Sequence, residues 1–143
     1  FYPIFNLAWG GTWGEVENQL SHLLILWTQV SVVIERMQGN GYAVSSDVFL
    51  TCEWIGRFTE KFSQLDISVD YVRRNEEYKD LCSNLYSHND KGIRQALVDR
   101  FAYGLPNFGK GTKKNPGWFY GFAADSWSAY AVAVTYIDRE TGK

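Results

Sequence analysis

The chain has 143 residues, of which 45% are hydrophobic and 21% charged, so it has the composition of a folded globular domain and not of a disordered chain. Its formal net charge of −2 excludes wholesale wrapping of nucleic acid, because that requires many phosphates to be neutralised by Lys and Arg. Aromatic residues make up 17% of the chain, and because Tyr and Trp are favoured at recognition surfaces, we expect some rings to face a partner.

The first predicted helix covers residues 13–38. It begins at a capping box, Thr12-Trp13-Gly14-Glu15, and ends at Gly39-Asn40-Gly41, where the residues tolerate positive φ. Between these ends, apolar residues recur every three or four positions, which is typical of a helix packed against neighbours in a bundle. Its longest apolar stretch, residues 23–34, is shorter than the ~20 residues of a membrane span, so we expect a buried central helix and no membrane span.

Three further helices are predicted before residue 105. The second begins at the N-cap sequence Ser45-Ser46-Asp47 and carries an apolar face as far as Phe62. The third, about 68–86, has a less regular pattern and uncertain ends. The fourth follows the polar break at 87–90 and closes at Gly104-Leu105-Pro106, since proline cannot continue a helix.

The C-terminal part has a different pattern. A loop of about a dozen residues follows position 105, and residues 118–122 and 130–136 have the aromatic or alternating character of two strands joined by a turn at 123–128. We therefore predict a single, mainly α domain over residues 1–143. It would have a four-helix bundle-like core at about 12–104 and a C-terminal aromatic β-hairpin or arm at about 105–143, with an α+β fold as the alternative.

Catalytic motifs are weak in this sequence. Cys82 and His88 could form a nucleophilic pair, but Cys82 falls on a predicted apolar helix face, so a small hydrolase or nuclease centred on His88 is the least favoured hypothesis. The segment Gly104-x4-Gly109-Lys110 approaches a phosphate-binding loop but lacks its hydroxyl residue and follows a helix. No His or Cys pair has the spacing of metal ligands. We expect no metal, no cofactor and a non-enzymatic role.

A basic and aromatic segment is the candidate site. Residues 105–122 contain no acid, and the site residues predicted there are Lys110, Lys113, Lys114, Trp118, Phe119 and Tyr120. Cations beside stacking rings suit single-stranded nucleic acid or an acidic protein surface. The alternative is a solvated loop that leads into a core hairpin. Because three lysines are few beside the roughly 6–10 phosphate contacts of a committed binder, we favour another protein or self-association over nucleic acid as the partner.

These observations lead to one functional hypothesis and a structural alternative. The hypothesis is a macromolecule-binding protein, such as an inhibitor, an immunity-type protein or a viral accessory protein, that uses the aromatic and basic C-terminal surface. The alternative is a self-assembling structural or coat protein, in which the hydrophobic tail of one subunit covers the next. Because the sequence starts at Phe1, we expect it to be a processed product or part of a longer protein.

Overall fold

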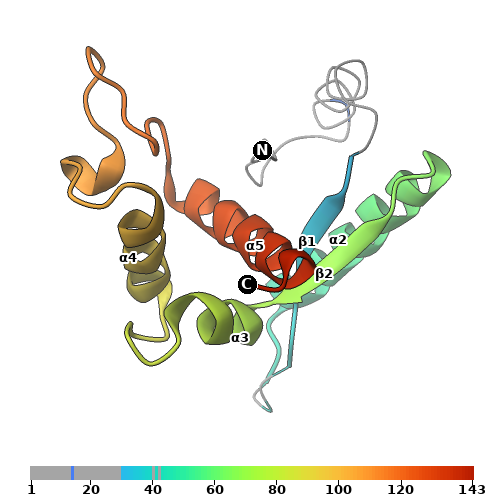
Figure 1. Cartoon of the computed structure of the whole chain (residues 1–143). Coiled ribbons are helices and arrows are strands. Elements are labelled where there is room, and N and C mark those ends of the chain that lie inside the picture. The colour runs from blue at the N-terminus through green and yellow to red at the C-terminus, as the bar shows by residue number, and fades with distance from the viewer. Residues whose placement is uncertain (1–13, 15–29, 40, 42) are drawn as a thin grey trace. The chain divides into compact units, whose positions relative to one another are not determined.

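The computed structural model of the chain describes residues 14, 30–39, 41 and 43–143. Contacts divide the described residues into two compact units, one that ends at Arg74 and one that spans Asn75–Lys143. Helices dominate both units, and the described strands form one small parallel sheet (Figure 1). The prediction of a mainly helical chain is confirmed. Among the described helices, none has the length and apolarity needed to cross a bilayer.

The first unit contains a strand-helix-strand motif. Strands β1 (Val32–Arg36) and β2 (Val69–Arg73) pair in parallel, with Val32 opposite Val69. Parallel neighbours cannot be joined by a tight turn, and helix α2 (Ser46–Gln64) supplies the required crossover. The predicted second helix is therefore confirmed, with Ser45 at its N-cap position.

Helix α2 is buried mainly toward its C-terminal end. Phe62 is buried there, and on the sheet Val72 of β2 is almost completely buried. The hydroxyls of Thr59 and Tyr71 lie 2.6 Å apart and join the helix to β2. Near the start of the helix, Phe49 is exposed. Burial against β2 thus holds one end of α2 more firmly than the other.

Two predicted helices are wrong in part. Residues 32–36, expected to continue the first helix, form β1, and most of the rest of that helix lies outside the described residues. The predicted third helix divides into β2, a short helix α3 (Arg74–Glu77) and a π-helical turn η1 (Tyr78–Cys82). Strands β1 (Val-Val-Ile-Glu-Arg) and β2 (Val-Asp-Tyr-Val-Arg) are too short for their periodicity to separate a strand from a helix, so the pairing of the two strands determined their structure.

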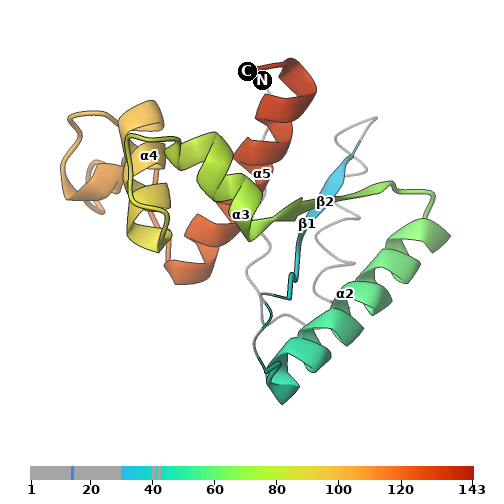
Figure 2. The same ribbon diagram turned by 90° about the horizontal axis from the view of Figure 1, so that it is seen from below.

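In the second unit, η1 packs with α4 (Asp90–Phe101) and α5 (Ala124–Thr141) (Figures 1 and 2). Helix α4 confirms the predicted fourth helix, and the Asn89 side chain caps it by accepting a hydrogen bond from the Gly92 N–H at 3.0 Å. A Cβ on Gly92 would lie 1.8 Å from the Ser87 carbonyl oxygen, so this tight start requires glycine. The buried core consists of Cys82, Ile93, Leu97, Val98, Ala102, Phe119, Trp127, Tyr130, Ala131 and Val134.

The predicted C-terminal hairpin is not confirmed, because residues 124–141 form helix α5. The buried residues of this helix include Trp127, Tyr130, Ala131, Val134 and Asp138, which recur every three or four positions. That spacing defines one helical face. The alternation of large and small residues at 130–136 coincides with this helical pattern and imitates a strand. The bundle prediction is not confirmed either, since the first unit is built on a sheet.

Candidate functional site

All six predicted site residues lie in the segment between α4 and α5, residues 103–122, which we call the aromatic loop. Figure 1 shows this loop, in orange, extending from the C-terminal end of α4. A 3-10 turn, η2 (Asn107–Gly109), opens it. The two arms of the loop, residues 109–111 and 116–119, then pair through their backbones. The Gly117 N–H donates to the Lys110 carbonyl at 2.9 Å, and the Phe119 N–H donates to the Gly109 carbonyl at 3.0 Å.

Close backbone contact fixes the conformation of the aromatic loop. A Cβ on Gly117 would lie 2.3 Å from the carbonyl oxygen of Gly109, nearer than carbon and oxygen can approach. Gly111 has a φ of 67°, and its Cβ would lie 2.3 Å from the carbonyl oxygen of Asn115. The sequence of the loop is therefore adapted to one compact backbone arrangement and not to a flexible connection.

The inner side of the loop belongs to the core. Phe119 is fully buried, and its ring centroid lies 4.5 Å from that of Trp127 and 5.6 Å from that of Tyr130. The Lys110 ammonium donates a hydrogen bond to the carbonyl of Phe122 at 2.5 Å. Phe119 and Lys110 thus anchor the loop, although the sequence pattern had placed both on the binding surface.

The loop also carries a set of exposed apolar side chains, and we call this set the outer face. The exposed fractions are 82% for Tyr103, 49% for Leu105, 53% for Phe108, 52% for Trp118 and 49% for Tyr120. The sequence pattern predicted Trp118 and Tyr120 as surface residues but not the other three. All of them are apolar residues among glycines and prolines, outside any periodic pattern, but the same description fits the buried Phe119, so only the tertiary structure separates exposed from buried positions here.

Phe108 combines exposure with backbone strain. Its φ of 53° and ψ of 36° lie in the left-handed region, which a bulky residue rarely adopts and which costs about 1–3 kcal/mol. Asn107 before it also has a positive φ of 54°. Since the Phe108 ring is half exposed, burial does not offset this strain. Strain that does not serve packing is typical of a functional position.

Trp118 is held in place by two partners. Its ring lies nearly parallel to that of Phe101, with centroids 5.8 Å apart and planes 6° apart. Its indole N–H donates a hydrogen bond to the Tyr130 hydroxyl at 3.1 Å. Burial raises the pKa of Tyr130, so this hydroxyl stays protonated at neutral pH. The half-exposed indole is therefore preorganised on the surface.

Two lysines lie at the tip of the loop. Lys113 and Lys114 are exposed within a turn that is closed by a hydrogen bond from the Thr112 N–H to the Asn115 carbonyl at 2.9 Å. Neither lysine forms an ion pair with a carboxylate of the described residues. The sequence has no acid from position 100 to position 124. The tip therefore carries a local positive charge on a chain of net negative charge.

The residues of the weaker catalytic hypothesis have structural contacts. His88 stacks on Tyr78 with ring centroids 5.9 Å apart, and its Nε2 lies 2.9 Å from the Ser83 carbonyl oxygen. Cys82 is fully buried. Within the described part of the chain, no group of three or more His, Cys, Asp or Glu residues could hold a metal ion. No observation here favours a hydrolase, which stays a hypothesis from the sequence.

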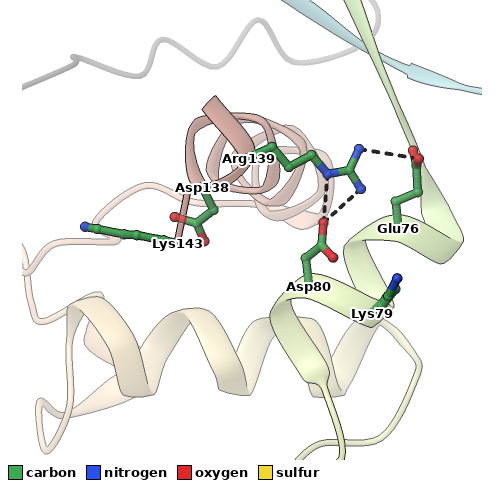
Figure 3. A pocket seen from close by; sticks show the side chains of 6 residues that line it. All are labelled: Glu76, Lys79, Asp80, Asp138, Arg139 and Lys143. Atoms are coloured by element: carbon green, nitrogen blue, oxygen red, sulfur yellow. Dashed lines mark hydrogen bonds and ion pairs between the residues drawn. The ribbon is translucent and has the colours of Figure 1, made fainter. Parts of the chain in front are cut away.

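A shallow polar hollow of about 440 Å³ lies between α5 and the segment of α3 and η1 (Figure 3). Its walls are formed by Glu76, Lys79, Asp80, Asp138, Arg139 and Lys143. The Arg139 guanidinium spans two of these acids, with nitrogens 2.8 Å from an Asp80 oxygen and 3.4 Å from a Glu76 oxygen. Asp138 is paired with Arg100. Because these charges neutralise one another, we interpret the charged residues around the hollow as a structural ion-pair network.

No protein-family model, curated protein or solved structure matches this chain significantly. The fold and the site therefore define the class of the protein by themselves. It is a mostly helical chain with a two-stranded parallel sheet and an ordered, exposed aromatic loop.

Proposed function

We propose that this chain is a non-enzymatic macromolecule-binding protein that uses the outer face of the aromatic loop. The observation that carries the proposal is the exposed Phe108 ring on a left-handed backbone. A strained aromatic residue in solvent lowers stability through its backbone, and its exposed ring contributes no burial that would offset this cost. Contact with a partner would supply that burial, because it would remove the ring from water.

The chemistry of the outer face suits binding. Tyr and Trp supply large contact area at low entropy cost and are enriched among the residues that dominate interface energies. The ring of Trp118 is already fixed by Phe101 and Tyr130, so little of its freedom remains to be lost on association. Inhibitors, immunity-type proteins and viral accessory proteins all act through such surfaces without a catalytic group.

A matched pair of variants tests the proposal. The double variant Tyr103→Ser/Tyr120→Ser removes two exposed rings from the outer face, and Leu85→Ser removes a side chain that is as exposed as Tyr103 but lies outside the loop. Each immobilised protein captures partners from a lysate of the producing cells, and both protein and nucleic acid are analysed. We expect wild type and Leu85→Ser to retain one partner that the double variant loses by at least about tenfold, which corresponds to about 1.4 kcal/mol for the two interface rings together.

Stability and oligomeric state complete the test. All three proteins should melt alike, because the altered side chains are exposed. If the partner is a second copy, light scattering will show a dimer or larger assembly that the double variant does not form. Equal retention of every partner by the double variant would contradict the proposal.

A further inference from the structure

We propose that the partner of the aromatic loop is a single-stranded nucleic acid, which stacks an unpaired base on Trp118 and places phosphates at Lys113 and Lys114. This inference rests on the proposed function and adds the chemical class of the partner.

The geometry of Trp118 is that of a stacking platform. The Phe101 ring lies nearly parallel to the indole, with centroids 5.8 Å apart, and Trp118 is nevertheless 52% exposed. A flat base on the exposed surface of the indole would add a further ring to this pair. Stacking of this kind accepts every base, because each has a π-face. Since the hydrogen bond to Tyr130 holds the indole, the platform exists before a base arrives.

Three more exposed rings lie on the same loop. Tyr103, Phe108 and Tyr120 are exposed on the same segment and form no ring pair with any described residue. Proteins that bind single strands without sequence preference combine several such rings with a positively charged path for the backbone. Four exposed rings on one short loop fit successive bases better than they fit the carboxylates of an acidic peptide.

The positive charge of the loop fits phosphate. Lysine carries a compact point charge with three rotatable N–H donors, and such ammonium groups bind phosphate oxygens. Trp118 follows Lys114 by four positions, so their Cα atoms lie at most about 14 Å apart. Bases paired within a duplex are not available to the indole, and a duplex binder needs more cations than this tip carries. The loop therefore favours a single strand.

Charge reversal at the tip is the first test. The probe is a fluorescein-labelled oligothymidine of about 20 nucleotides, longer than the ~4–16 nucleotides of one single-strand site, and binding is followed by anisotropy over a salt titration. Lys113→Glu/Lys114→Glu should weaken binding by more than about tenfold and reduce the slope of log K against log salt by about 1.4. Lys61→Glu/Lys91→Glu changes net charge equally at exposed lysines on α2 and α4, and it should bind within about threefold of wild type.

Stacking is tested at Trp118. Trp118→Ala should weaken oligothymidine binding by about 5- to 150-fold, the range measured for the loss of one stacked base. Trp118→Phe keeps a ring beside Phe101 and should lose much less affinity, and equal far-UV circular dichroism of the two variants at the assay temperature excludes a folding defect in Trp118→Ala. In the wild type the oligonucleotide should also quench indole fluorescence, and Trp118→Phe should remove that quenched component.

The outcomes separate the inference from the proposed function. Absent oligothymidine binding at low salt, or binding that the Lys113→Glu/Lys114→Glu variant retains in full, would overturn the inference. Binding of a polyglutamate peptide in place of oligothymidine, weakened by the same variants, would overturn it too and leave the proposed function standing with an acidic protein as partner. Only equal partner retention by Tyr103→Ser/Tyr120→Ser contradicts the proposed function itself.

Discussion

The indole N–H of Trp118 donates a hydrogen bond to the hydroxyl of Tyr130, at 3.1 Å. Trp118 is a half-exposed residue of the aromatic loop, whereas Tyr130 is a buried residue of α5. Phe119, the next residue after Trp118, is fully buried against Tyr130. The exposed surface and the core of the second unit are thus connected through one tyrosine.

Removing the Tyr130 hydroxyl should loosen the outer face more than it harms the core. Tyr130→Phe keeps the buried ring but removes the acceptor of the indole bond, so we expect the free energy of unfolding to fall by about 0.5–1.5 kcal/mol. Acrylamide should then quench Trp118 more strongly. Urea denaturation and fluorescence quenching measure the two effects, and Tyr103→Phe serves as the control because its side chain is exposed. Unchanged quenching would show that the bond does not fix the indole.

Burial raises the pKa of Tyr130 above its ordinary value of 10.0, and this shift predicts an effect of pH. Because the folded pKa exceeds the unfolded one, the neutral phenol contributes stability that is complete below pH 10 and is lost as the pH rises through the folded pKa. We expect the free energy of unfolding to fall above about pH 10, and to fall less in Tyr130→Phe. Urea denaturation at several pH values measures this difference, and identical pH profiles would exclude Tyr130 as its source.

A partly buried ion pair joins α4 to α5. The Arg100 guanidinium donates two hydrogen bonds to the Asp138 carboxylate, at 2.5 and 2.7 Å, and these bonds raise the pKa of Arg100 so that it stays charged. Asp138→Ala should lower the free energy of unfolding by about 1.5–3 kcal/mol, toward the lower figure because Arg100 is partly solvated.

The matched control for this pair is Glu53→Ala on α2. Glu53 pairs with Arg57 one turn away, and both side chains are more than half exposed, at 53% and 58%. Exposed pairs of this spacing contribute only about 0.3–0.5 kcal/mol. Urea denaturation should therefore separate the two variants clearly. Equal effects would mean that burial adds nothing to the Arg100–Asp138 pair.

Two glycine substitutions should have opposite effects. Gly117→Ala places a Cβ 2.3 Å from the Gly109 carbonyl oxygen, so the arms of the aromatic loop must separate and we expect a loss of about 1–3 kcal/mol. Gly56→Ala lies inside α2 with no atom near the new Cβ, and it should add about 0.4–1 kcal/mol. Thermal denaturation of both variants shows whether each substitution raises or lowers the stability. A neutral Gly117→Ala would show that the loop backbone adapts.

Phe108→Asn tests whether backbone strain is retained for binding. Asn adopts the left-handed conformation more readily than Phe, so we expect the free energy of unfolding to rise by about 1 kcal/mol while partner binding weakens. The measurements are urea denaturation and anisotropy with the oligothymidine probe. A less stable variant with unchanged binding would instead make the Phe108 ring a packing residue.

Local sequence signals were sufficient to predict those features that depend only on neighbouring residues. The polar residues before α2 and α4 predicted where these helices start, with Ser45 and Asn89 at the N-cap positions, although only Asn89 accepts a capping hydrogen bond through its side chain. Glycine, proline and the loss of periodicity predicted the loop after residue 105, and the run without acids predicted its positive tip. The choice of Lys113, Lys114, Trp118 and Tyr120 as surface residues agrees with their exposure. Their role in binding stays a prediction.

Long-range contacts decided the rest. Residues 32–36 form a strand because a parallel partner at 69–73 satisfies their backbone groups, and no local pattern shows that partner. The run at 130–136 became part of α5 because Trp127, Tyr130 and Val134 share a core with α4. The same packing turned Phe119 inward and left Trp118 and Phe108 outside. Sequence determined which segments could be helical or exposed, whereas tertiary packing determined which side of each segment meets water, because burial is gained only between elements distant in the chain.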